Sequence, residues 1–219
     1  MRATRWLMGL GVATLLSTPA TAAGQTAVRQ TAFGIKGGVT YADAAFYDQF
    51  TSVARARTLV GAFVTLPLSD RGTIQIEALH IEKGFATTGL HEEGSTTTMS
   101  YLDFPILLRF RLTPQPSRVS PILMAGGYWG HEVACRSIGG VASFEESESC
   151  EGRFELRGVA DVGLTVGGAV EVAVTGGWFV LVDARYHVGL RNLHWDPASD
   201  GSNARNWSAL GGVGLRIDR

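Results

Sequence analysis

Ten charged side chains lie on the polar faces of alternating stretches in this 219-residue chain. They are Lys36, Glu77, Asp103, Arg109, Arg111, Asp161, Glu171, Asp183, Arg185 and Arg216. These groups could line a pore or bind an anion. Because both signs are present, they could instead pair with one another in a buried interior. Burying one of them alone would cost on the order of several kcal/mol. We therefore expect pairing, and we call this set the lumen charge network.

Histidines and serines offer a second kind of chemistry, in which a general base activates a hydroxyl nucleophile to modify a lipid. Such a site would combine serine, histidine and an acid at the outer rim of a membrane barrel, and would draw on His91, His131, His187 and His194, with Ser143, Ser147 or Ser208. The sequence contains neither a GxSxG nor an HExxH motif, and no spacing specifies the required geometry. We expect no catalytic residues, no metal site and no cofactor, and keep a lipid-modifying enzyme as an alternative.

The first 23 residues predict a cleaved secretory signal peptide. Arg2 and Arg5 precede an apolar segment, 6–16, and small residues follow at 20–22. That segment is too short to span a bilayer as a helix. We expect a signal peptide over 1–23 and a single domain over 24–219.

The only cysteines, Cys135 and Cys150, belong to this exported chain, which favours a disulfide between them. The segment that they enclose is rich in glutamate but lacks the regular Asp and Asn spacing of a calcium loop. We expect a solvated surface loop closed by the disulfide.

Alternating segments recur through the rest of the chain and predict antiparallel strands. We place eight of them, near 32–42, 57–68, 72–84, 99–112, 119–132, 156–172, 177–191 and 206–217. Short connections follow the second, fourth and sixth, and long connections follow the others, as in an up-and-down barrel with turns at one end and loops at the other. The alternation becomes unclear at 79–82, where we expect a bulge or the membrane boundary.

The segment YLDFPILLRFRL, 101–112, raises the question of which strand face meets the surroundings. Its even positions from Leu102 to Leu112 are apolar, whereas its odd positions include Asp103 and Arg109. Glycine recurs on the polar faces, where it would weaken a solvated strand but would leave room inside a narrow barrel. Aromatic residues gather near the strand ends: Phe33, Trp178 and Phe179 at one rim, and Tyr41, Phe85, Tyr101, Tyr128, Trp129 and Trp207 at the other.

These patterns favour an apolar outer face in lipid over a soluble lipocalin-like barrel in the periplasm. With 19 basic and 20 acidic residues, the chain carries no basic field for nucleic acid. The expected partners are outer-membrane lipid and, through the long loops, an extracellular ligand or protein.

Several motifs resemble the PorT-type outer membrane β-barrel domain family. They are GIKGGV (34–39), IQIEAL followed by EKG (74–84), YLDFP (101–105), SPILMAGGY (120–128) and ARYHVGL (184–190). The resemblance implies a small all-β, eight-stranded antiparallel barrel in the outer membrane of a Gram-negative bacterium, without a stated molecular activity. The chain departs from many such barrels by ending in GLRIDR (214–219) rather than in an aromatic residue. We expect a non-enzymatic protein with a structural or surface-interaction role and a charge-plugged lumen.

Overall fold

The structure is a computed structural model that describes residues 30–43, 51–88, 95–114, 117–138, 144–147, 160–192 and 203–217. The expected signal peptide lies outside these residues. Within the described ranges, no helix has the length and apolar character needed to cross a membrane.

The described residues form strands connected by turns and loops. The strands are β1 (Thr31–Asp43), β2 (Thr51–Pro67), β3 (Gly72–Thr88), β4 (Ser95–Arg111), β5 (Val119–Ile138), β6 (Phe144–Ser147), β7 (Ala160–Ala173), β8 (Trp178–Asn192) and β9 (Asn203–Ile217).

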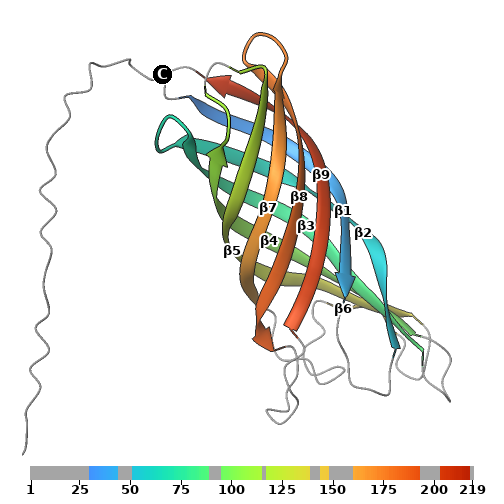
Figure 1. Cartoon of the computed structure of the whole chain (residues 1–219). Coiled ribbons are helices and arrows are strands. Elements are labelled where there is room, and N and C mark those ends of the chain that lie inside the picture. The colour runs from blue at the N-terminus through green and yellow to red at the C-terminus, as the bar shows by residue number, and fades with distance from the viewer. Residues whose placement is uncertain are drawn as a thin grey trace, which may run out of the picture.

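These strands close into an eight-stranded antiparallel barrel, which confirms the expected fold class. Neighbouring strands run in the order β4, β3, β2, β1, β9, β8, β7, β5, and pairing of β4 with β5 completes the circle. The short strand β6 pairs with the far end of β5, through Cys135 opposite Ser147 and Ser137 opposite Phe144. Figure 1 shows the tilted strands wrapping around a common axis.

The two-residue alternation explains both the strands and their orientation. In β4, Leu107 is fully buried whereas its neighbour Leu108 is 60% exposed, and the same alternation holds from Tyr101 to Arg111. A one-residue slip would exchange the two faces, so the apolar outer residues and charged inner residues together fix the register.

The short connections also fall as expected, after β2, β4 and β7, at one end of the barrel, uppermost in Figure 1; those at 68–71 and 174–177 are fully described. In the tightest of them, the amide of Trp178 donates to the carbonyl of Thr175 at 3.0 Å, and Gly176 and Gly177 have φ values of 58° and 83°. This is the type I′ geometry, whose positive φ values favour glycine and whose twist suits a hairpin. The strands reach further at the loop end than the sequence predicted, since β4 begins at Ser95 and β5 continues to Ile138.

The alternation that was unclear in the sequence at 79–82 continues through this segment in the structure. Leu79 and Ile81 are almost fully buried, whereas His80 is exposed, so β3 keeps its alternation through this segment. A register shift in the pairing of β2 with β3 lies directly after it, between Ala54 and Leu59 on β2 and between Ile81 and Phe85 on β3. The pattern looked irregular because the inward residues are apolar here, as the outward residues are elsewhere.

Candidate functional site

The barrel interior brings the members of the lumen charge network together. All ten residues lie on inward faces, and each takes part in at least one ion pair. They form three groups along the axis. We call them the central cluster (Lys36, Glu77, Asp183, Arg185), the loop-side cluster (Asp103, Asp161 and Lys83) and the turn-side cluster (Arg109, Arg111, Glu171, Arg216).

The central cluster spans the barrel. Arg185 of β8 contacts both carboxylate oxygens of Glu77 on β3, at 2.7 and 2.9 Å, and donates to Asp183 at 2.8 Å. Lys36 of β1 donates to the same Glu77 at 2.7 Å and to Asp183 at 3.2 Å. Gln75 also donates to Glu77. Two basic and two acidic groups therefore neutralise one another, and their side chains are at most 1% exposed.

The loop-side cluster centres on Lys83, a residue that the sequence analysis did not include. Its ammonium lies 2.6 Å from Asp161 and 3.4 Å from Asp103. It also lies over the rings of Tyr101 and Tyr128, at 4.5 and 5.3 Å from their centroids. The sequence could have identified Lys83 as an inward residue, because it follows Glu77, Leu79 and Ile81 at two-residue steps on the same face of β3.

The turn-side cluster places three guanidinium groups around one carboxylate. Glu171 of β7 accepts from Arg109 of β4 at 2.6 Å and from Arg216 of β9 at 2.8 Å. Arg111 lies 3.6 Å from the same carboxylate. This cluster is the most basic of the three, and it lies near the short turns.

Apolar clusters, which we call the apolar layers, also fill the interior beside the charged clusters, and the sequence did not predict them. The layers are Leu59, Leu79, Ile81 and Leu210; Ala32, Phe63, Phe179 and Leu181; and Leu107, Ile122, Met124 and Ala169. Inward glycines make room for rings as well as for charged groups. A Cβ atom at Gly214 would lie 2.4 Å from the ring of Phe179, and one at Gly163 would lie 2.5 Å from that of Tyr128.

His187 and Ser208 do meet, but inside the barrel rather than at a rim facing lipid. His187 Nε2 lies 3.0 Å from Ser208 Oγ, and its Nδ1 lies 2.8 Å from Thr165 Oγ1. All three residues are buried, and the third member is a hydroxyl rather than the carboxylate that would orient a catalytic histidine. His131 points outward on β5, whereas His91, His194, Ser143 and the side chain of Ser147 lie outside the described residues.

Cys135 is fully buried on β5, whereas Cys150 lies outside the described residues, so their bond stays a prediction. For a loop of this length the chain-entropy estimate of the stabilisation is about 3 kcal/mol. Mass spectrometry of alkylated, unreduced protein checks it. We expect no added alkyl group before reduction and two after it, and two added without reduction would rule the bond out.

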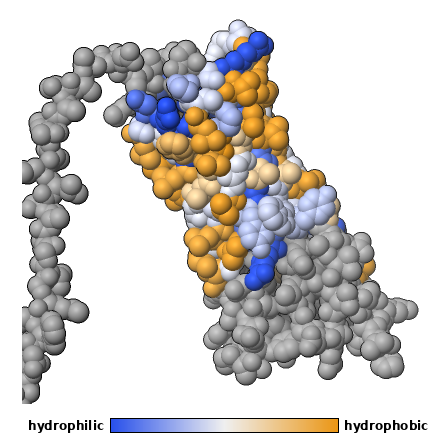
Figure 2. Space-filling view, in the orientation of Figure 1, coloured by the Kyte–Doolittle hydropathy of each residue, from blue (hydrophilic) through white to orange (hydrophobic). Residues whose placement is uncertain are grey.

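The outer wall is apolar from the short turns towards the loop end, as the orange side chains in Figure 2 illustrate on the visible face. Large apolar side chains are exposed on every barrel strand, among them Ile35, Val60, Ile76, Leu108, Leu123 and Val182. A water-soluble protein rarely exposes a continuous surface of this kind, whereas a barrel in lipid requires one.

The expected aromatic rims are correct in part. Phe33 and Trp178 are exposed near the short turns, and Tyr41, Trp129 and Trp207 are exposed towards the loops. In contrast, Tyr101, Tyr128 and Phe179 point inward and are at most 5% exposed. Their odd or even position in the strand places them on the inner face, and position near a strand end is not sufficient to assign a residue to the rim. The side chain of Phe85 lies outside the described residues.

Comparisons with known proteins give one family and several structural relatives. The family described as outer membrane protein beta-barrel domain matches residues 22–194. A search of curated proteins finds no significant match.

Two solved structures illustrate the similarity of fold. Neisserial surface protein A is 12% identical, with a TM-score of 0.53, and the alignment covers 85% of this chain and 97% of that one. The outer membrane protein OprG from Pseudomonas aeruginosa is also 12% identical, with a TM-score of 0.52, covering 88% of this chain and 98% of that one. At this identity the similarity shows a shared fold.

Proposed function

The chain belongs to the outer membrane protein beta-barrel domain family, and from this premise we propose that it is a non-enzymatic integral protein whose plugged lumen does not conduct. Family membership and the apolar outer wall place it in the outer membrane of a Gram-negative bacterium. The alternative of a periplasmic lipocalin-like barrel is therefore wrong.

The observation that carries the proposal is the contact between Arg185 and Glu77. In the circular strand order, β8 and β3 stand opposite each other, so these two side chains meet across the full width of the barrel. An eight-stranded barrel is only wide enough for its own side chains. A bidentate ion pair across that width, with Lys36 and Asp183 beside it, leaves little room for an aqueous path.

The apolar layers strengthen the plug. Leu59, Leu79, Ile81 and Leu210 come from β2, β3 and β9 and lie between the central and loop-side clusters. Such a layer disfavours water and therefore raises the barrier for an ion. Apolar side chains and ion pairs thus fill the lumen together.

The same arrangement supports a non-enzymatic role. Ser208 and His187 are held against Thr165 inside the barrel, where a lipid substrate outside the wall does not reach them. In this proposal the outer wall contacts lipid. The long loops form the contact surface for an extracellular ligand or protein. The motifs GIKGGV and YLDFP, which supply Lys36 and Asp103, support a PorT-type assignment within the family.

Planar-bilayer recording tests the plug. We expect the purified protein to give at most small, rare openings. The charge-neutral double variant Glu77→Ser with Arg185→Ser should open more often, because it removes the side chains that meet across the barrel while leaving Lys36 paired with Asp183.

The matched control changes His80 and Glu82 to serine, since both lie on the outer face of β3 beside Glu77. This control should be as quiet as the parent protein. Steady, large conductance from the unmodified barrel would contradict the plugged lumen and show that the barrel is a pore.

A further inference from the structure

The turn-side cluster holds more positive charge than its single carboxylate neutralises. Arg109, Arg111 and Arg216 all direct an Nη2 atom at Glu171, whereas the central cluster is neutral and the loop-side cluster has two carboxylates for one ammonium. The side chains of Arg109 and Arg111 are only 4% and 10% exposed. Buried charge of one sign destabilises the fold unless a counter-charge lies beside it.

Two donors of this cluster have no acceptor. Arg109 Nε and Arg111 Nε are buried and make no hydrogen bond within the described part of the chain. Both residues are more than nine-tenths buried. An unpaired buried donor on a charged group is costly, so these atoms mark a place where an acceptor belongs.

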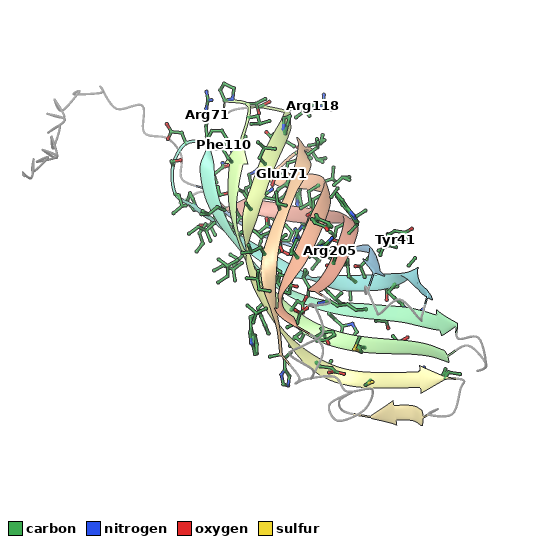
Figure 3. The ribbon with its side chains drawn as sticks, turned by 60° about the horizontal axis from the view of Figure 1, so that its bottom comes forward. Tyr41, Arg71, Phe110, Arg118, Glu171 and Arg205 are labelled. Carbon is green, nitrogen blue, oxygen red and sulfur yellow. The ribbon has the colours of Figure 1, made fainter. Side chains whose placement is uncertain are left out.

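The cluster lies near the end of the barrel that carries the short turns. Arg216 is the most exposed of its members, and its guanidinium lies 4.6 Å above the ring of Phe179. Figure 3 shows Arg71 and Arg118 at this end, beyond Glu171, and both are exposed. Asp70 is exposed in the same turn as Arg71. The rim and the cluster together favour the approach of an anion.

We propose that the turn-side cluster binds a small phosphate-class oxyanion. The planar guanidinium fork suits phosphate oxygens, and Arg109 and Arg111 would supply their unpaired Nε donors while Glu171 holds the three side chains in place. The side chains point into the lumen and not into the membrane, so the ligand is a solute rather than a lipid headgroup. In outer-membrane barrels the short turns face the periplasm, which makes the periplasm its source.

Phosphorus-31 NMR titration of inorganic phosphate into the full barrel, in a phosphate-free detergent at constant ionic strength, measures the binding. We expect saturable broadening that chloride does not abolish. Arg111→Gln should weaken binding by about tenfold or more, the effect of losing a charged hydrogen-bond donor. This variant keeps the two shorter contacts of Glu171 with Arg109 and Arg216. Arg118→Gln, which removes an exposed rim charge, should change binding by no more than about twofold.

The change Glu171→Gln gives the opposite expectation and keeps the test decisive if Arg111→Gln does not fold. Glutamine keeps an amide oxygen that can accept from Arg109 and Arg216, whereas loss of the carboxylate charge adds net positive charge, so phosphate should bind more tightly. The proposal is overturned by absence of saturable binding to the parent barrel, by equal weakening in Arg111→Gln and Arg118→Gln, or by weaker binding in a folded Glu171→Gln variant. The titration does not measure conductance, so its outcome and that of the plug experiment are separate.

Discussion

Replacing Glu77 by glutamine is expected to lower the free energy of unfolding by about 3–5 kcal/mol, the usual loss when one partner of a buried ion pair is removed. Glutamine has nearly the same size, so the loss comes from charge and not from a cavity. Glu77 contacts both Lys36 and Arg185, and without its charge these two cations share only Asp183. Urea unfolding of the barrel in liposomes, followed by tryptophan fluorescence, measures the change.

Glu82→Gln is the matched control, because the residue type and the strand are the same but the side chain faces outward. Glu82 accepts a hydrogen bond only from the exposed Thr58 among the contacts that the structure describes. We expect its loss to be within about 0.5 kcal/mol, as for most surface substitutions. Similar losses in the two variants would mean that the central cluster contributes no special stability.

Leu108→Arg should destabilise the folded barrel by about 2–4 kcal/mol, the cost of an arginine on the lipid face near the bilayer midplane. Leu108 is 60% exposed and lies in the middle of the outward apolar row of β4. The same liposome unfolding assay reports the loss. In cells, the fraction of protein that migrates as a folded, heat-modifiable band should fall.

Leu112→Arg makes the same substitution just beyond the end of β4, where the cost falls to about 0–1 kcal/mol near the interface. Leu112 is also exposed, so the two variants differ mainly in depth. If Leu112→Arg were the more damaging of the two, the assigned position of the membrane along β4 would be incorrect.

The odd or even position of a residue in its strand made much of the barrel predictable. Because side chains alternate strictly, the pattern of 101–112 fixed both the apolar outer face and the inward direction of Asp103, Arg109 and Arg111. The alternation of short and long connections indicated the up-and-down order. The same rule would have identified Lys83, had the apolar inward residues Leu79 and Ile81 not obscured the phase of β3.

The alternation within one strand does not show which charged side chains pair across the lumen. Arg185 meets Glu77, 108 positions earlier in the chain, because closure of the sheet brings β8 opposite β3. Likewise, Tyr128 and Phe179 were assigned to the rims by proximity to strand ends, whereas the lumen accepts their rings beside Gly163 and Gly214.

The sequence by itself thus determined which face turns inward in strands whose inner and outer residues differ in polarity, as in 101–112, since that depends only on two-residue periodicity. The tertiary structure decided which charges pair, which apolar side chains fill the space between them, and that three arginines share one carboxylate. These outcomes depend on the stagger of distant strands around a closed barrel, and stagger is a property of the whole circle of hydrogen-bonded pairs and not of any one segment.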